Sequence, residues 1–358
     1  MTPAAINPVL MTGLLQNIQG LRGVAILLVL FVHIGSAVAW FGRWDGAPQW
    51  LNVGLSGVDI FFVISGFIMA TIVSGEFRKP GSVVTFLFAR AARIYPVYVL
   101  VSLAFLASHD AFPPAISQHW QNRDVMRSLL LLPQDELPVL VVGWTLEHEM
   151  YFYVVTGLLL LLPERFFIHA VFLWGVAATV AGLAVGAVGP TVGHITHPLT
   201  LEFVAGCLIA RLIQAGYRQY AVLALIAGTV LLPAGYCTFA LGEIPDGWLR
   251  VALFGVPATL IVYGACGMEV THTLRFPRWL RFIGDISYSL YLTHVPIILA
   301  VALAWSKSPG ARETPAVGAI LMSVATIATG IATYYLLELP LHKVARRMKQ
   351  RMASRWNS

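Results

Sequence analysis

Charged residues are scarce in this sequence. Asp, Glu, Lys and Arg make up only 11% of its 358 residues, whereas 58% of the residues are hydrophobic. A soluble globular domain carries about 25% charged residues, so this composition excludes a mainly soluble protein. The net charge of +6 is modest. Because the basic residues are spread over many segments, they do not form the basic patch of a nucleic-acid-binding protein, and we expect no nucleic-acid partner.

Cysteine is rare as well, with only Cys207, Cys237 and Cys266. Each cysteine lies in or beside an apolar stretch, and the spacing fits neither a zinc site nor a disulfide framework. We therefore interpret the cysteines as helix-packing residues and expect no metal site. The N-terminus lacks a basic segment ahead of a short apolar one, which argues against a cleavable signal peptide.

Long apolar runs, in contrast, are abundant. Ten of them are long enough to span a bilayer as helices, at about residues 21–41, 56–74, 84–107, 140–162, 167–188, 197–214, 219–241, 248–268, 283–305 and 315–337. The sequence therefore predicts an all-α fold, a polytopic transmembrane helical bundle of about ten spans. We expect the transmembrane domain to cover residues 1–342 and residues 343–358 to form a basic cytoplasmic tail that binds the membrane lipid surface.

The basic residues also predict the orientation of the chain. If the N-terminus lies inside, 17 of the 23 Lys and Arg residues face the cytoplasm. By the positive-inside rule, this bias places both termini in the cytoplasm and the loop at 42–55 outside. The residues placed inside are Arg22, Arg78, Lys79, Arg90, Arg93, Arg165, Arg211, Arg218, Arg275, Arg278, Arg281, Lys343, Arg346, Arg347, Lys349, Arg351 and Arg355.

The first span carries an arginine at its entrance and a histidine in its middle. Arg22 and His33 are eleven residues apart, which is within about 20° of three full helical turns, so both side chains share one face. The rise between them is about 16 Å, or half the thickness of the hydrocarbon core. His33 is therefore predicted to lie near the midplane, where an ionisable group is costly and marks a functional site.

Three other spans carry an ionisable residue that is predicted to lie in the middle or outer half of the membrane. These residues are Asp59 in the second span, Glu149 in the fourth and His294 in the ninth. Tyr291 and His294 also share a stripe with Ser287, because the three residues follow the spacing i, i+4, i+7. We expect these groups to converge on a shared polar cavity in the middle or outer half of the membrane.

A second group of polar residues is predicted near the cytoplasmic surface. Arg90 and Arg93 lie three residues apart on one face of the third span. Two guanidinium groups in this arrangement suit phosphate oxygens, although they also fit simple positive-inside anchors.

Trp144 and Tyr291 are candidate substrate-binding residues, and Trp144 equally fits an interfacial aromatic anchor.

Five motifs occur in order along the chain: Arg22-x10-His33, Gly57-Val-Asp-Ile-Phe-Phe-Val-Ile-Ser-Gly-Phe, Arg90-x-x-Arg93 before Ile-Tyr-Pro, Trp144-Thr-Leu-x-x-Glu149-x-x-Phe-Tyr, and Ile286-Ser-Tyr-Ser-Leu-Tyr-Leu-x-His294-x-Pro. On these motifs the chain resembles the bacterial acyltransferase-3 family of integral-membrane O-acyltransferases, and within it the exopolysaccharide acetyltransferase branch. Many relatives carry Ser where this chain has Thr145, and the hydroxyl group is kept.

The resemblance implies an enzyme of the bacterial cytoplasmic (inner) membrane that takes an acyl group, most simply acetyl, from cytoplasmic acetyl-CoA or another acyl-CoA. The acceptor implied is a sugar hydroxyl of a cell-surface or exported glycan or of a lipid-linked sugar. The resemblance also implies that Arg22 and His33 are needed for transfer. No permanently bound cofactor is expected, since acyl-CoA is a donor substrate.

Acyl transfer from a thioester to a hydroxyl needs a base for the hydroxyl and stabilisation of the developing oxyanion. His33 is the candidate base, or alternatively a carrier that accepts the acyl group itself. Asp59 or Glu149 could orient the imidazole, and Arg22 together with Arg90 and Arg93 suits the phosphates of CoA. His294 is the other histidine predicted at this depth.

Two other classes of protein remain open at this stage. A proton-coupled membrane transporter also places His, Asp and Glu at the midplane, but carriers more often show inverted repeats, and we find no internal repeat. A receptor or structural membrane protein would leave the intramembrane polar motifs unexplained. The sequence leaves the acceptor glycan and the oligomeric state open.

Overall fold

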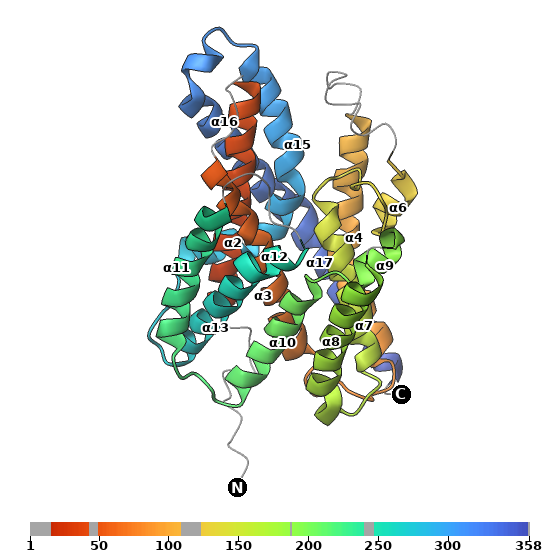
Figure 1. Cartoon of the computed structure of the whole chain (residues 1–358). Coiled ribbons are helices and arrows are strands. Elements are labelled where there is room, and N and C mark those ends of the chain that lie inside the picture. The colour runs from red at the N-terminus through yellow and green to blue at the C-terminus, as the bar shows by residue number, and fades with distance from the viewer. Residues whose placement is uncertain (1–15, 43–48, 109–122, 187, 240–246, 357–358) are drawn as a thin grey trace. The chain divides into compact units, whose positions relative to one another are not determined.

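The computed structural model describes residues 16–42, 49–108, 123–186, 188–239 and 247–356, and the described residues form helices and turns without any β-strand (Figure 1). The predicted all-α fold is therefore confirmed. Eight helical segments in these residues are long and apolar enough to cross a membrane. The protein is a polytopic helical bundle, while the count of ten spans and the location of the termini stay predictions.

Each of the ten predicted spans contains a helix. These are α2 (Gln16–Phe41), α3 (Ser56–Ile72), α4 (Ser82–Ala107), α7 (Gly143–Leu159), α8 (Phe167–Val185), α10 (Thr200–Gln214), α11 (Ala221–Phe239), α13 (Val256–Val270), α15 (Ser287–Ser306) and α16 (Pro315–Thr333). Most predicted boundaries agree with these to within five residues, because Gly, Pro and polar clusters end the apolar runs. The exception is the span 248–268, whose first eight residues fall in α12 and η5 ahead of α13.

Several further elements were not predicted as separate elements, and α12, η5 and η7 overlap the ends of predicted spans. They are α6 (Val125–Leu130), α9 (Gly189–Ile195), α12 (Gly247–Arg250), α14 (Arg278–Asp285) and α17 (Leu339–Trp356), three 3₁₀ turns, η1 (Gln49–Leu55), η4 (Glu164–Phe166) and η6 (Ala311–Glu313), and two π-helices, η5 (Val251–Gly255) and η7 (Tyr334–Glu338). Most of the predicted basic tail lies in α17. The domain boundary at residue 342 stays a prediction.

The chain divides into two compact units, which we describe separately. The first unit comprises residues Met1–Gly75, Glu164–Val180 and His197–Ser287, and the second comprises Glu76–Pro163, Ala181–Thr196 and Tyr288–Ser358.

Glycines bring the helices of the first unit into close contact. A Cβ atom on Gly66 of α3 would lie 2.0 Å from the Phe203 carbonyl oxygen of α10, and one on Gly206 of α10 would lie 2.0 Å from the Val63 carbonyl oxygen of α3. Only glycine permits this approach of two backbones, which is the usual way of packing helices without a hydrophobic driving force between them. The α3–α10 pair is therefore the closely packed core of the first unit.

In the second unit, α4 packs against both α7 and α17, α15 meets α16 at two glycines of α16, and α7 meets α15 through side-chain hydrogen bonds described below. Gly330 of α16 faces the Leu290 side chain of α15, at 2.2 Å for an added Cβ, and Gly318 faces the ring of Trp305. Both α4 and α15 contain an internal proline, Pro96 and Pro296. Proline is tolerated in membrane helices because neighbouring groups satisfy the freed carbonyl.

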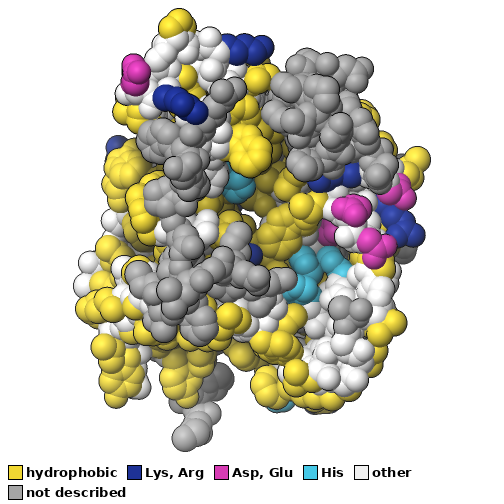
Figure 2. Space-filling view, turned by 45° about the horizontal axis from the view of Figure 1, so that its top comes forward, with side chains coloured by type: hydrophobic (Ala, Val, Ile, Leu, Met, Phe, Trp, Pro, Cys, Tyr) yellow, Lys and Arg dark blue, Asp and Glu magenta, His cyan; other side chains and the backbone are white. Residues whose placement is uncertain are grey.

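Large apolar side chains cover much of the described surface, and charged side chains are few among them (Figure 2). Exposed apolar residues occur along α8, α11 and α16, including Leu183, Leu223 and Val324. This distribution fits helices whose outer faces meet lipid. Cys207 and Cys266 are buried and have free thiols, and their role in helix packing stays a prediction. The Cys237 side chain lies outside the described residues.

Candidate active site

The start of α2 is fixed by polar contacts, which sets the position of the residues that follow. The Glu269 carboxylate accepts hydrogen bonds from the backbone N–H groups of Gln16 and Asn17, at 2.7 and 2.6 Å. The buried Asn17 side chain donates to the carbonyl oxygens of Ala265 and Leu274, at 2.9 and 3.0 Å. Backbone N–H groups at a helix start have no partner within the helix, so Glu269 satisfies two of them and anchors α2 to α13.

Arg22 lies one and a half turns further along α2 and is buried. Its Nη1 donates to Oε1 of Gln19 at 3.0 Å. The adjacent helix α14 ends at Asp285, close to Arg22 and Arg281. Partial burial raises the pKa of Asp285, and the two nearby guanidinium groups oppose that rise. Arg22 is therefore one of several polar side chains, with Gln19 and Asp285, at the contact of α2 with α14.

His33 is half-buried, and its ring orientation is defined by a backbone contact. Its Nδ1 lies 2.8 Å from the carbonyl oxygen of Val29. A carbonyl oxygen only accepts, so Nδ1 carries the hydrogen in this contact and the lone pair of the neutral imidazole is on Nε2. This is the tautomer that a general base or an acyl-accepting nucleophile needs at Nε2.

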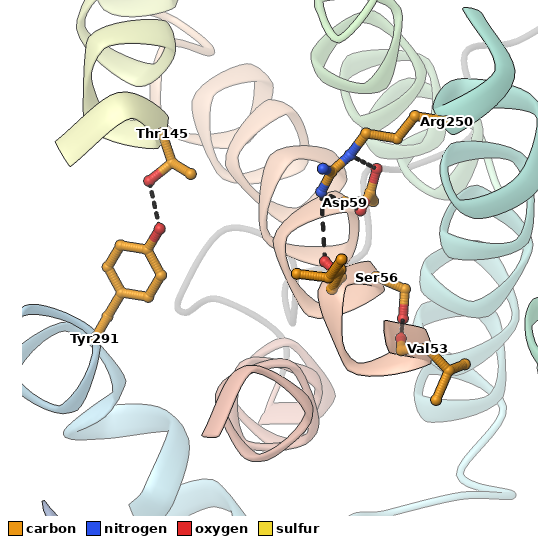
Figure 3. A network of polar contacts seen from close by, with 7 residues as sticks. Val53, Ser56, Asp59, Thr145, Arg250 and Tyr291 are labelled. Atoms are coloured by element: carbon orange, nitrogen blue, oxygen red, sulfur yellow. Dashed lines mark hydrogen bonds and ion pairs between the residues drawn. The ribbon is translucent and has the colours of Figure 1, made fainter. Parts of the chain in front are cut away.

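Asp59 of α3 is fully buried and pairs with Arg250 of α12. The Arg250 Nε and Nη2 atoms donate to the two carboxylate oxygens of Asp59 at 3.0 and 2.9 Å, and Nη2 also lies 3.4 Å from the Leu55 carbonyl oxygen (Figure 3). Gly57 packs on the Ala25 carbonyl of α2. Two residues later the helix has turned by about 200°, so Asp59 faces away from that contact and towards Arg250.

In the second unit, Tyr153 joins Glu149 to the arginine pair. The Tyr153 hydroxyl donates to Oε1 of Glu149, and the Arg90 guanidinium carbon lies 5.9 Å from the centre of the Tyr153 ring. Arg93 and Glu149 are close enough to Arg90 for their charges to act on it. From the sequence, Glu149 was expected in the middle or outer half of the membrane and the arginines near the inner surface. The structure instead brings the two motifs into one network.

A buried acid extends the polar groups of this unit. Glu338, at the end of the π-helix η7, is 2% exposed and accepts a hydrogen bond from the Ser289 hydroxyl. The adjacent Tyr288 donates to the Ile94 carbonyl oxygen at 2.6 Å, which fixes α15 against the part of α4 that follows Arg93. The electrostatic surroundings of Tyr288 include Glu338, Glu149 and Arg93.

Tyr291 and His294 lie on α15, as their spacing predicted. The hydroxyl groups of Tyr291 and Thr145 are 2.8 Å apart, and that of Tyr291 also donates to the Val142 carbonyl oxygen at 3.2 Å (Figure 3). His294 is fully buried and its Nδ1 lies 2.7 Å from the Tyr291 carbonyl oxygen. His33 is thus partly exposed, whereas His294 is fully buried.

Trp144 belongs to an aromatic cluster at the start of α7. Its ring meets that of His148 edge-on, with the centres 6.1 Å apart, and His148 stacks on His194 of α9 with centres 4.0 Å apart. Tyr151 meets His194 at 5.8 Å. The cluster gives Trp144 fixed neighbours, and its role in substrate binding stays a prediction.

The nine predicted site residues thus divide between the two units. The first unit holds Arg22, His33 and Asp59, and the second holds Arg90, Arg93, Trp144, Glu149, Tyr291 and His294. Their catalytic and binding roles stay predictions.

The sequence analysis missed the two partners of these residues, Arg250 and Tyr153, and the buried acid Glu202 of α10. Arg250 was placed among the few basic residues outside, although apolar residues flank it on both sides. Glu202 was a visible signal, since it interrupts an apolar run. Partners separated by almost 200 residues, such as Asp59 and Arg250, cannot be paired from one sequence.

Comparisons with known proteins agree on one family. The family model described as an acyltransferase domain matches residues 15–335. The exopolysaccharide production protein ExoZ of Rhizobium meliloti (strain 1021) is 34% identical over 314 residues, which cover 85% of this chain and 95% of that protein. Acyltransferase MdmB of Streptomyces mycarofaciens is 24% identical, with 88% and 89% covered.

The O-acetyltransferase OatA of Staphylococcus aureus (strain NCTC 8325 / PS 47) is 23% identical over 92% of this chain and 57% of that longer protein. No solved structure matches the chain.

Proposed function

The chain belongs to the family of this acyltransferase domain, and on that premise we propose that it acetylates a hydroxyl group of an exported polysaccharide, with a cytoplasmic acyl-CoA as donor. The observation that carries the proposal is the likeness to ExoZ over nearly the whole of that protein, which is named for exopolysaccharide production. The O-acetyltransferase OatA supports acetyl as the group transferred. A multi-pass helical protein of this kind belongs in the bacterial cytoplasmic membrane.

Arg90 and Arg93 are the proposed site for the CoA phosphates. Both residues are partly exposed and lie on one face of α4. Tyr153 packs beside Arg90, which restricts the arginine side chain and lowers the entropy cost of binding a phosphate. Arginine binds phosphate oxygens with two donors at once, so the pair suits a diphosphate.

His33 is the proposed base or acyl carrier. In the base mechanism, Nε2 takes the proton of the acceptor hydroxyl as its oxygen attacks the thioester carbonyl, the C–S bond breaks, and the CoA thiolate takes up a proton. In the carrier mechanism, Nε2 attacks the thioester carbonyl first, the C–S bond breaks and CoA leaves as the thiolate. The acceptor hydroxyl then attacks the acyl-imidazole, the N–C bond breaks to return the imidazole, and the hydroxyl proton goes to the CoA thiolate through solvent. Both routes need the tautomer that the Val29 contact favours. They give the same products, an ester and free CoA thiol.

The transporter interpretation gains no support from the relatives described above. A direct test uses protein purified in detergent, radiolabelled acetyl-CoA and the polysaccharide of cells that lack the chain. We expect label to enter the polysaccharide in the absence of any ion gradient. We also expect the polysaccharide of cells that express this chain to be heavier, by whole acetyl groups, than that of cells that lack it. The control is a detergent preparation from cells that lack the chain. Identical polysaccharides from cells with and without the chain, together with no transfer in detergent, would refute the proposal.

A further inference from the structure

The ion pair of Asp59 with Arg250 has a third member in the first unit. Glu202 of α10 is 1% exposed, and Asp59 and Arg250 are 0% and 7% exposed. The Glu202 carboxyl group faces the carboxyl group of Asp59 within hydrogen-bonding reach. Three ionisable side chains from α3, α10 and α12 therefore meet inside the closely packed core of this unit.

Glu202 has no donor in this environment. Among the residues that the structure describes, no N–H or O–H group donates to either of its carboxyl oxygens. On the other side, Gly255 leaves only enough room for the carboxyl group, because a Cβ atom there would lie 2.6 Å from Oε1. The donors of Arg250 are directed at Asp59 instead.

The cluster of Asp59, Glu202 and Arg250 combines two carboxyl groups with one guanidinium group. Arg250 supplies one positive charge, and it is matched by the Asp59 carboxylate, whose two oxygens both accept from it. An ionised Glu202 would add a second negative charge with no donor, buried within a membrane-spanning helix, which is strongly unfavourable. A proton on Glu202 removes that charge and supplies an O–H donor that points at Asp59.

We infer that Glu202 is held as the neutral acid and shares its proton with Asp59, so that Glu202, Asp59 and Arg250 form a buried, electrically neutral proton-binding site. The ligand of this site is a single proton. Both ends of the π-helix η5 border this site, because η5 begins directly after Arg250 and ends at Gly255, which contacts the Glu202 carboxyl group. Such π-helical turns are rare and frequently occur at functional sites.

The site also positions the helix that carries His33. Gly57 of α3 packs on the Ala25 carbonyl of α2, and Asp59 on the opposite side of α3 is held by Arg250 and Glu202. Glu202 therefore acts through α3 on α2, as a positioning residue for His33. This link to acyl transfer rests on the proposed function, whereas the presence of the proton does not.

Infrared spectroscopy of the purified full chain tests the proton directly. We expect the C=O stretch of a protonated carboxyl group at neutral pH, a shift of that band when glutamate is labelled with ¹³C, and its loss in Glu202→Gln. The control is Glu76→Gln, because Glu76 is exposed and pairs with Lys79 at 3.1 Å; this variant should keep the band. Absence of the band in the wild type, or its persistence in Glu202→Gln, would overturn the inference.

Two further variants separate the proton from simple packing. Glu202→Gln keeps an N–H donor towards Asp59 and should fold with nearly the wild-type thermal stability. Glu202→Leu removes the donor and should lower both the stability and the kcat of transfer, while the KM for acetyl-CoA stays the same. A Glu202→Gln protein that fails to fold, or a Glu202→Leu protein as stable as Glu202→Gln, would also contradict the inference. If the wild type transfers no acyl group but shows the band, the proposed function fails and the proton site stands.

Discussion

Replacing Arg250 by glutamine should be among the most destabilising single changes in this protein outside its backbone-packing glycines. The change removes both donors to the Asp59 carboxylate, at 3.0 and 2.9 Å, and leaves that carboxylate buried and uncompensated. Breaking a buried ion pair by removing one partner costs about 3–5 kcal/mol. Such a cost is a large fraction of the total stability of a protein.

Removing both charges should cost much less. In the Asp59→Asn/Arg250→Gln double variant no unpaired charge remains, so we expect the double variant to be more stable than Arg250→Gln alone. The stability of Arg250→Lys should lie between those of the wild type and Arg250→Gln, because an ammonium group keeps the positive charge but cannot pair with both carboxylate oxygens as the guanidinium group does. The difference between the double variant and the sum of the two single ones measures the coupling of the pair.

The assay is denaturant unfolding in detergent micelles, with Arg127→Gln as the matched control. Arg127 also pairs with an aspartate, Asp124, but at 3.6 Å and with about half of each side chain exposed. An exposed pair of this kind contributes about 0–1 kcal/mol. If Arg250→Gln lowers the unfolding free energy no more than Arg127→Gln does, or if the double variant is the least stable of the set, the description of Asp59 and Arg250 as a tightly coupled buried pair is refuted.

Four further predictions concern the site and the topology. His33→Ala should abolish transfer while the protein inserts and binds CoA, and a carrier His33 should leave labelled protein when acyl-CoA is supplied without acceptor. Arg90→Ala and Arg93→Ala should each weaken CoA binding about ten- to a hundredfold, measured by calorimetry, because each removes a charge-assisted contact of about 1.5–3 kcal/mol. Tyr153→Phe keeps the ring beside Arg90 but removes the hydroxyl that donates to the Glu149 carboxylate, so transfer should fall more than CoA affinity. A cysteine introduced in the loop at 42–55, of which residues 43–48 lie outside the described residues, should be labelled from outside intact spheroplasts.

Each of these predictions has a contrary outcome. Near-normal transfer by a stable His33→Gln protein would remove His33 from the chemistry. Unchanged CoA affinity in folded Arg90→Ala and Arg93→Ala proteins would leave these residues as membrane anchors. Equal losses of transfer and CoA affinity in Tyr153→Phe would make Tyr153 a part of the donor site alone. Labelling of the loop only after permeabilisation would reverse the topology.

The sequence by itself determined the architecture. Apolar runs of about twenty residues have one stable form in a bilayer, the helix, because every backbone N–H and C=O group must be satisfied within the segment. For the same reason most of the ten helical ranges were predicted to within five residues, whereas α13 begins eight residues after the start of its predicted range. The order of five motifs along the chain identified the family, and the comparisons confirm it. Helical periodicity also placed Tyr291 and His294 on one stripe of α15.

Only the tertiary structure decided which polar groups meet. Periodicity orders residues along one helix but carries no information about which helices are neighbours. Arg250 was therefore placed at the outer end of the predicted span 248–268 without any link to Asp59, with which it pairs. Depth counted along a single helix assigned Glu149 and Arg90 to different layers, whereas Tyr153 brings them together. Glu202 was missed because the role of a single acid in an apolar run depends on which side chains lie next to it, and the sequence does not show these. Its interpretation as a proton-binding residue depends on the Asp59 carboxylate that faces it and on the close α3–α10 packing that excludes other donors.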